Sequence, residues 1–204
     1  MNSTAHHRHA TRKVGYDYTQ AGAYFVTIVT AERAGRFGTI VDGEMNLNGV
    51  GQMLLNEWQR LPGRFSGLEV DAFMIMPNHI HGLLILYPPS VVTTDDIVGA
   101  QRDGSSPQPS IVPLRPHASR VGIDDGDSAP HVNTGSVGAI VRAFKSSTTL
   151  RYHRMRAAEP GLLWQRNYYE HIVRGSASLD HIRAYILINP TQWELDHENP
   201  DRIP

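Results

Sequence analysis

Two apolar runs, residues 68–76 and 79–87, are separated by only Pro77 and Asn78. A connection this short between two strand-length runs predicts a β-hairpin. His79 and His81 open the second run, and alternate residues of a strand point to the same face, so Ile80 is expected to point into the core. The hairpin thus places two imidazoles side by side, which is half of a divalent-metal site. The alternative is that both histidines are satisfied polar residues at a strand end.

The segments before the hairpin predict one strand and one helix. Residues 23–30 are β-branched and aromatic, as expected of a strand, and residues 35–43 are expected to form a loop or a short strand. Asn48 can cap a helix that runs to about Leu61 and ends at Pro62. The apolar face of that helix comprises Val50, Met53, Leu54, Trp58 and Leu61.

The segments after the hairpin predict two more helices and an extended stretch. From Ser136 a helical spacing of apolar residues resumes, at Val137, Ile140, Val141, Phe144, Leu150 and Tyr152. Residues 164–174 are expected to be extended, and Ser178 can cap a last helix from Leu179 to about Asn189, which Pro190 stops. The order strand, helix, strand, strand, helix, strand, helix favours an α+β fold with an antiparallel sheet and helices mainly on one face.

A chain of 204 residues is expected to form one domain with appendages. Residues 1–14 are polar and basic, and we expect them to be flexible. Residues 88–133 are rich in Pro, Gly, Ser and Asp without a sustained period, which predicts a mobile insertion. The single folded domain is therefore expected to span residues 15–193 around this insertion, and residues 194–204 to form a C-terminal tail.

Composition excludes several classes of protein. The chain has no cysteine, so disulfides, zinc–thiolate sites and cysteine nucleophiles are excluded. We see no secretory signal and no run long enough to span a membrane. The net charge of −1 conceals a basic block at 136–174, which contains seven Lys and Arg residues and only two acidic residues. Such a block suits a phosphate backbone, although scattered arginines are more often a solvated helix face.

The last predicted helix carries His181, Tyr185 and Asn189 at intervals of four residues. This spacing places the three along one stripe of the helix, beside a second stripe of Ile182 and Ile186 that can face the core. A tyrosine hydroxyl one turn from a carboxamide is a candidate nucleophile with an oxygen ligand nearby. The alternative is that Tyr185 packs its ring at the edge of the core, as most tyrosines do.

Five motifs in this order resemble the REP-associated tyrosine transposases, which belong to the single-tyrosine His-hydrophobic-His (HUH) transposases of bacterial insertion sequences. The resemblance covers about residues 12–87 and 134–193. The motifs are Gly22-Ala23-Tyr24-Phe25-Val26-Thr27, Met76-Pro77-Asn78-His79-Ile80-His81-Gly82, Phe144-Lys145-Ser146, Trp164-Gln165-Arg166-Asn167-Tyr168-Tyr169-Glu170-His171-Ile172-Val173-Arg174 and Tyr185-Ile186-Leu187-Ile188-Asn189-Pro190.

The resemblance implies a ferredoxin-like core and a metal-dependent enzyme that cleaves and rejoins single-stranded, hairpin-bearing DNA. His79 and His81 would bind Mg²⁺ or Mn²⁺, and Asn189 would be a third ligand. Tyr185 would attack the scissile phosphate and become joined to the 5′ end, which frees a 3′-hydroxyl. The protein would be cytoplasmic, bacterial and nucleoid-associated, a monomer or homodimer, with no membrane partner.

Other residues are expected to contact DNA rather than to react. Tyr168 and Tyr169 are rival nucleophiles, but the resemblance places catalysis on Tyr185, so we interpret these two as packing or base-stacking residues. The basic residues expected at the phosphates are Arg12, Lys13, Arg142, Lys145, Arg151, Arg166 and Arg174.

Two other functions remain open from the sequence. A domesticated relative could recognise a DNA hairpin without cutting it, although such a binder has no need of His79, His81, Tyr185 and Asn189 together. An RNA-binding module that stacks bases on its sheet would need aromatic residues at alternate strand positions. Only Tyr24 and Phe25 are candidates, and as neighbours they point to opposite faces.

Overall fold

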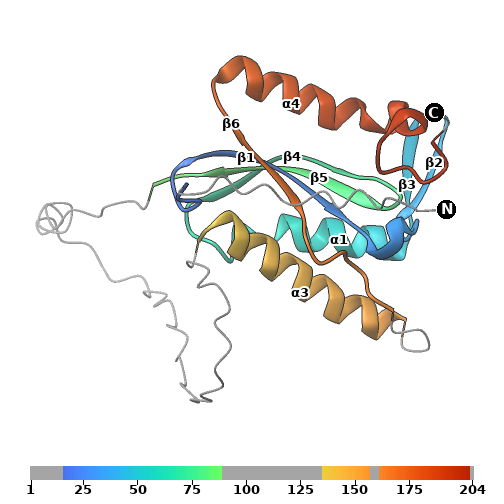
Figure 1. The fold of residues 1–204 in the computed structure, drawn as a ribbon. Coiled ribbons are helices and arrows are strands. Elements are labelled where there is room, and N and C mark those ends of the chain that lie inside the picture. The colour runs from blue at the N-terminus through green and yellow to red at the C-terminus, as the bar shows by residue number, and fades with distance from the viewer. Residues whose placement is uncertain (1–15, 89–134, 157–160, 203–204) are drawn as a thin grey trace, which may run out of the picture. The chain divides into compact units, whose positions relative to one another are not determined.

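The core of the protein is a four-stranded antiparallel sheet (Figure 1). The computed structural model describes residues 16–88, 135–156 and 161–202. The predicted flexible N-terminus, and the predicted insertion except its first residue, lie outside the described residues. The strand order is β4-β5-β1-β6, and the strands are β1 (Gly22–Val29), β4 (Leu68–Ile75), β5 (His79–Leu86) and β6 (Tyr169–Val173).

Three helices cover the two faces of the sheet. Helices α1 (Gly49–Gln59) and α3 (Val137–Met155) lie side by side below the sheet in Figure 1, and α4 (Ser176–Ile188) lies above it. Helix α1 connects β1 to β4 and α3 connects β5 to β6, which with this strand order is the ferredoxin-like topology. The predicted α+β class, with helices mainly on one face, is confirmed.

Shorter elements surround this core. Strands β2 (Gly38–Val41) and β3 (Glu44–Leu47) form a separate hairpin, so the segment predicted as a loop or short strand contains a strand. The 3₁₀ turn η1 (Ala31–Arg33) follows β1, and η2 (Asn189–Leu195) follows α4.

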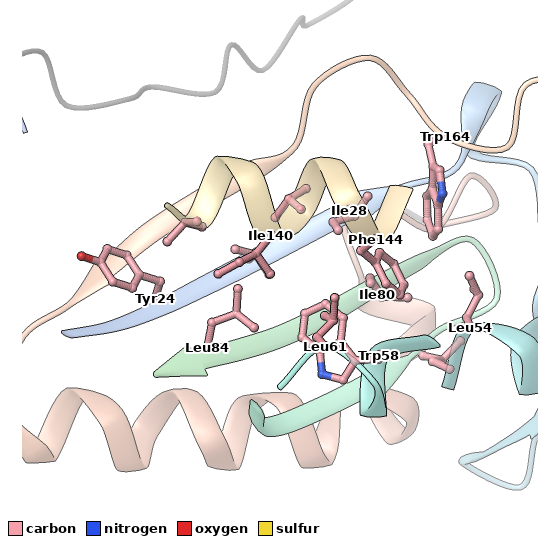
Figure 2. Packing of buried hydrophobic residues seen from close by; sticks show 14 of the residues in the cluster. Tyr24, Ile28, Leu54, Trp58, Leu61, Ile80, Leu84, Ile140, Phe144 and Trp164 are labelled. Atoms are coloured by element: carbon pink, nitrogen blue, oxygen red, sulfur yellow. The ribbon is translucent and has the colours of Figure 1, made fainter. Parts of the chain in front are cut away.

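The main core lies between the sheet and helices α1 and α3 (Figure 2). Tyr24, Ile28, Ile80 and Leu84 alternate with residues that face the other side, so they point from β1 and β5 toward the two helices. The helices contribute the predicted apolar faces, including Leu54, Trp58, Ile140 and Phe144. As predicted, the Asn48 side chain caps α1, accepting hydrogen bonds from the backbone nitrogens of Val50 at 2.9 Å and Gly51 at 3.0 Å.

A smaller cluster lies on the opposite face, under α4. It consists of Phe25, Leu83, Val173 and Ile186, with Ile182 packed against its edge. The prediction that Ile182 and Ile186 turn toward the core is therefore confirmed. Because this cluster covers only part of the face, the end of the sheet near His79 is left for polar side chains.

Two details of the predicted helices were wrong. Leu150 is 54% exposed, because the buried stripe of α3 runs from Phe144 through Thr148 to Tyr152 at intervals of four residues. Helix α4 begins at Ser176 rather than Leu179. Gly175 precedes it with φ at 80°, a left-handed conformation that glycine adopts readily, so the chain turns into the helix earlier than a serine cap would suggest.

Gly82 allows the main core to close around β5. The indole of Trp58 lies against its backbone and stacks on Phe73, with ring centroids 4.4 Å apart. A Cβ atom at Gly82 would overlap the Trp58 ring, which other core side chains hold in place. The glycine that follows His81 is therefore required by packing.

We predict that Gly82→Ala lowers the free energy of unfolding by about 2 kcal/mol, since overpacking a closed core costs about 1–3 kcal/mol. The matched control is Gly35→Ala, where an added Cβ meets no atom within 4 Å. Urea denaturation of both variants measures the effect. Equal stability of Gly82→Ala and the parent protein would contradict this account of the packing.

Candidate functional site

The pairing of β1 with β5 places the histidine pair on the face away from the main core. His79 lies opposite Val29 and His81 opposite Thr27. As predicted, both imidazoles point to the same side, and their Nε2 atoms are 3.0 Å apart. His79 is 0% exposed and His81 is 3% exposed. The rigid strand thus presents two ring nitrogens to one point.

Hydrogen bonds fix both imidazole rings from behind. His79 Nδ1 lies 2.8 Å from Asn78 Oδ1, and His81 Nδ1 lies 2.9 Å from Thr27 Oγ1. Phe25 stacks on the His81 ring at a centroid distance of 5.3 Å. Each Nε2 atom therefore faces the site while each Nδ1 atom is held by a neighbouring side chain, the arrangement typical of metal-binding histidines.

The environment keeps both histidines neutral. Burial lowers the pKa of His79 to about 3. Burial is also the main cause that lowers the pKa of His81 well below 6.5, with a further contribution from His79 and an opposing one from Asp196. A neutral imidazole keeps a lone pair on one ring nitrogen, which is the form that binds a metal ion.

Asp196 completes the group and was not predicted. Its Oδ2 atom lies 3.8 Å from His79 Nε2, and its side chain is only 6% exposed. Its Oδ1 atom accepts a hydrogen bond of 2.6 Å from the backbone nitrogen of Glu198, which orients the carboxylate. One ligand atom from each of His79, His81 and Asp196 lies within 4.8 Å of the others, so these three residues could hold a metal ion.

No local pattern in the sequence singles out Asp196. It lies in an acidic tail among Glu194, Glu198 and Asp201, and only the chain reversal after α4 brings it beside the histidines. The nearest signal is Trp193, whose ring lies 6.0 Å from that of His79 and which marks a segment that packs on the protein.

Asn189 lies at the C-cap of α4 and is 2% exposed. Its Oδ1 atom is buried and has no hydrogen-bond partner among the residues that the structure describes. A buried amide oxygen without a donor carries a desolvation cost that a ligand would relieve. The structure places Asn189 on the wall of the same cavity as His81 and Asp196. Its predicted role as a metal ligand stays a prediction.

Tyr185 reaches the histidine pair from α4. Its hydroxyl lies 3.4 Å from His81 Nε2, and its ring is 6.1 Å from that of Phe25. The residue is 36% exposed and lines the cavity. His181, one turn earlier on α4, is exposed. The imidazole that faces the tyrosine therefore belongs to His81.

Two contacts hold α4 over the sheet. Ile186 is buried in the smaller cluster with Phe25 and Leu83. Arg183 donates from Nε to both carboxylate oxygens of Asp71 on β4, each at 3.1 Å, and these hydrogen bonds lower the pKa of Asp71. An apolar anchor and a forked ion pair on neighbouring turns set both the height and the rotation of the helix, and hence the position of Tyr185.

A cavity of about 1220 Å³ extends from His81 along the 161–169 segment. Arg166, Tyr168 and Tyr169 line it together with Tyr185 and Asp196. Tyr169 is 43% exposed, and its ring forms a T-shaped pair with Phe25 at a centroid distance of 6.3 Å. The Tyr168 hydroxyl instead donates to Glu170 Oε2 at 2.7 Å. The cavity therefore combines aromatic faces and a basic side chain beside the polar site.

The other predicted DNA-contacting residues are not gathered at the site. Arg142 and Arg151 lie on α3, which packs on the face of the sheet opposite the histidine pair, and Arg151 forms an ion pair with Glu57 at 2.9 Å. Lys145 donates to the carbonyls of Gln165 at 2.6 Å and Arg166 at 3.0 Å, while burial lowers its pKa to about 8.

Lys145 thus supports the 161–169 segment from behind. Arg174 is exposed at the end of β6. Arg12 and Lys13 lie outside the described residues. The DNA contacts expected of all these residues stay predictions.

Within the described ranges, the helices are too short or too polar to cross a membrane.

The chain is similar to a protein of Haemophilus influenzae that is known only as uncharacterized. The two are 33% identical over 196 residues, which cover 96% of this chain and 94% of the relative. No family model matches the sequence. A solved structure of a REP-associated tyrosine transposase bound to a REP hairpin is similar at 17% identity, with a TM-score of 0.49, over 87% of this chain and 72% of that chain. Similarity at that level leaves the chemistry of this chain to its own residues.

We predict that Asp196→Asn weakens binding of Mn²⁺ by at least about tenfold, because a neutral amide replaces the carboxylate of the group. Asp201→Asn is the matched control, since it removes the same charge from an exposed position of the same segment. Isothermal titration calorimetry measures both affinities. Equal losses in the two variants would mean that only the charge of the segment matters.

Proposed function

We propose that this chain, which belongs to the same family as the uncharacterized Haemophilus influenzae protein, is an HUH single-tyrosine transposase: a metal-dependent endonuclease and strand transferase acting on single-stranded DNA. One observation carries the proposal. The Tyr185 hydroxyl lies 3.4 Å from His81 Nε2, beside a buried His-His-Asp group and at one end of a large open cavity. A candidate nucleophile and candidate metal ligands therefore lie together beside a cavity large enough to admit part of a DNA strand.

The donor set suits a divalent ion. His79, His81 and Asp196 offer two neutral nitrogens and one carboxylate oxygen, and the buried Asn189 Oδ1 would supply a further oxygen. Mixed imidazole and oxygen ligands fit Mn²⁺ and, with more oxygen, Mg²⁺. Bound there, the ion would withdraw electron density from a phosphoryl oxygen of the substrate. In this chemistry the Tyr185 hydroxyl oxygen is the protein atom that forms the covalent bond to the substrate.

In the reaction that we propose, with the strand polarity that the family resemblance implies, Tyr185 is the nucleophile. Its oxygen forms a bond to phosphorus as the bond from phosphorus to the 3′-oxygen breaks, so the DNA strand leaves with a 3′-hydroxyl. The proton lost by the tyrosine equals the one gained by that hydroxyl. The 5′-phosphate remains on Tyr185 as a phosphodiester, and attack by another 3′-hydroxyl reverses the step and joins a new strand. No water is consumed.

The cavity supports a single strand as the substrate. Tyr169 presents an exposed ring beside Phe25, and aromatic faces of this kind stack on unpaired bases. Arg166 on the same wall supplies positive charge for the backbone. Hairpin oligonucleotides made from any palindromic repeats found in the DNA that flanks the gene are the substrates that we propose to test.

The alternative is a protein that binds DNA hairpins without cutting them. Such a protein gains nothing from burying two neutral histidines and a carboxylate around one point, because the burial of polar groups costs free energy that stacking and phosphate contacts do not require. The anchoring of α4 by Arg183 and Asp71, which holds Tyr185 at the histidines, also favours the enzyme.

We predict that Tyr185→Phe abolishes the covalent protein–DNA adduct and leaves folding intact, because the change removes only one oxygen atom from a residue that is 36% exposed. Tyr169→Phe is the matched control on the same cavity and should keep the adduct. The adduct with a labelled hairpin oligonucleotide is trapped and digested, and the modified peptide is located by mass spectrometry. A nucleotide on Tyr168 or Tyr169, with Tyr185→Phe still active, would show that the nucleophile lies on β6 or beside it.

We also predict that His81→Ala lowers cleavage by about 100-fold or more, as loss of a group that stabilises developing charge typically does. DNA binding should change little, because phosphate contacts supply most of the affinity. Cleavage assays with Mn²⁺ or with EDTA and a gel-shift assay separate the two effects. Equal cleavage with EDTA would refute the metal role, and binding without cleavage in the parent protein would favour the alternative.

A further inference from the structure

We propose that Asn78 is a positioning residue that determines which nitrogen of His79 carries its proton. The inference deepens the proposed function, because it concerns the readiness of His79 to bind a metal ion. Asn78 is 0% exposed and occupies the turn of the β4–β5 hairpin, directly before His79. Each of its three side-chain contacts is to a different part of the chain.

The orientation of the Asn78 amide is determined by its donors. Nδ2 donates one hydrogen to the carbonyl of Arg33 at 3.0 Å and the other to the carbonyl of Glu198 at 2.6 Å. A flipped amide would place Oδ1 against both carbonyls, with no hydrogen between the oxygens. Because an amide has two donors and both are used, Oδ1 is the atom that faces His79.

The orientation of the amide dictates the tautomer of His79. Oδ1 can only accept a hydrogen bond, and it lies 2.8 Å from His79 Nδ1. Nδ1 must therefore carry the proton, which leaves the lone pair of the neutral ring on Nε2. Nε2 is the atom that faces His81 and Asp196. Asn78 thus presents a metal-binding nitrogen to the site before any ion arrives.

Thr27, the partner of His81 Nδ1, imposes no such restriction on His81. Its Nδ1 atom lies 2.9 Å from the hydroxyl of Thr27, which can either donate or accept a hydrogen bond. His81 can therefore carry its proton on Nε2, where it bridges to His79 at 3.0 Å, or on Nδ1, where it donates to Thr27. The two histidines differ for this reason: Asn78 selects one tautomer of His79, whereas Thr27 can bond to either tautomer of His81.

The two carbonyls that orient Asn78 come from segments that also bind each other. Arg33 Nε donates to Glu198 Oε2 at 3.0 Å, so η1 and the C-terminal segment, residues 189–202, are in contact at the hairpin turn. Arg33 adopts a φ of 54°, an uncommon conformation for a residue with a side chain. The selection of the His79 tautomer therefore depends on the positions of both η1 and the segment that contains Glu198, because each contributes one of the carbonyls that orient Asn78.

The test reads the ring nitrogens of the metal-free protein. Histidine ¹⁵N chemical shifts distinguish protonated from unprotonated ring nitrogens, and loss of signals in His79→Ala and His81→Ala assigns them. At neutral pH we expect a proton on Nδ1 and none on Nε2 of His79 in the parent protein. A His79 ring protonated on Nε2 would overturn the proposal by itself, whatever the variants do.

Asn78→Leu keeps the approximate volume of the side chain and removes its polar atoms. We expect His79 to lose its preference for Nδ1 and the affinity for Mn²⁺ to fall by about 10- to 100-fold, the usual effect of removing a partner of a ligating histidine. Thr27→Val is the matched control: it removes the partner of His81 and should leave the His79 shifts unchanged.

An unchanged His79 tautomer in Asn78→Leu would refute the positioning role. So would unchanged Mn²⁺ affinity in a variant whose tautomer has shifted. None of these measurements uses DNA, so they can succeed even if the protein cuts no strand, and cleavage can be confirmed even if Asn78 proves unimportant.

Discussion

The antiparallel register of β1 and β5 is the constraint on which the site depends. It places His81 opposite Thr27 and His79 opposite Val29, while Ile80 lies opposite Ile28 in the main core. Because side chains alternate along a strand, a slip of one residue would turn both histidines into the core and expose Ile80. The hydrophobic cost of that exchange holds the imidazoles on the face where α4 and the C-terminal segment meet them.

The two faces of the sheet have different structural roles. One face is closed by α1 and α3, and the fit of Trp58 against Gly82 shows how tightly that side is packed. The other face is only partly covered by α4, whose small cluster leaves room for buried polar groups and a cavity. The fully packed face supplies stability, so the open face can hold neutral histidines and a carboxylate whose burial costs free energy.

The site is assembled from rigid elements together with the C-terminal segment. Two ligand candidates stand on β5 and the candidate nucleophile on α4, which Ile186 and the Arg183–Asp71 pair hold in place. A helix anchored this way positions a hydroxyl more accurately than a loop would, which matters when its oxygen atom must approach a phosphorus atom in the correct geometry. The C-terminal segment then adds Asp196, and through its Glu198 carbonyl it helps to orient Asn78.

Patterns along the chain were enough to predict the hairpin, the shared face of His79 and His81, the Asn48 cap and the inward stripe of Ile182 and Ile186. Each depends on a local period or on a side chain bonded to its own neighbours. The contribution of Asp196 and the orientation of the Asn78 amide were decided only by the tertiary structure, as was the exposure of Leu150. Asp196 lies more than a hundred residues from the histidines, Asn78 is oriented by carbonyls 45 and 120 residues away, and Leu150 depends on which side of α3 packs on the sheet. A sequence period cannot specify which distant segment returns to a given point, because that choice is made when the whole core packs.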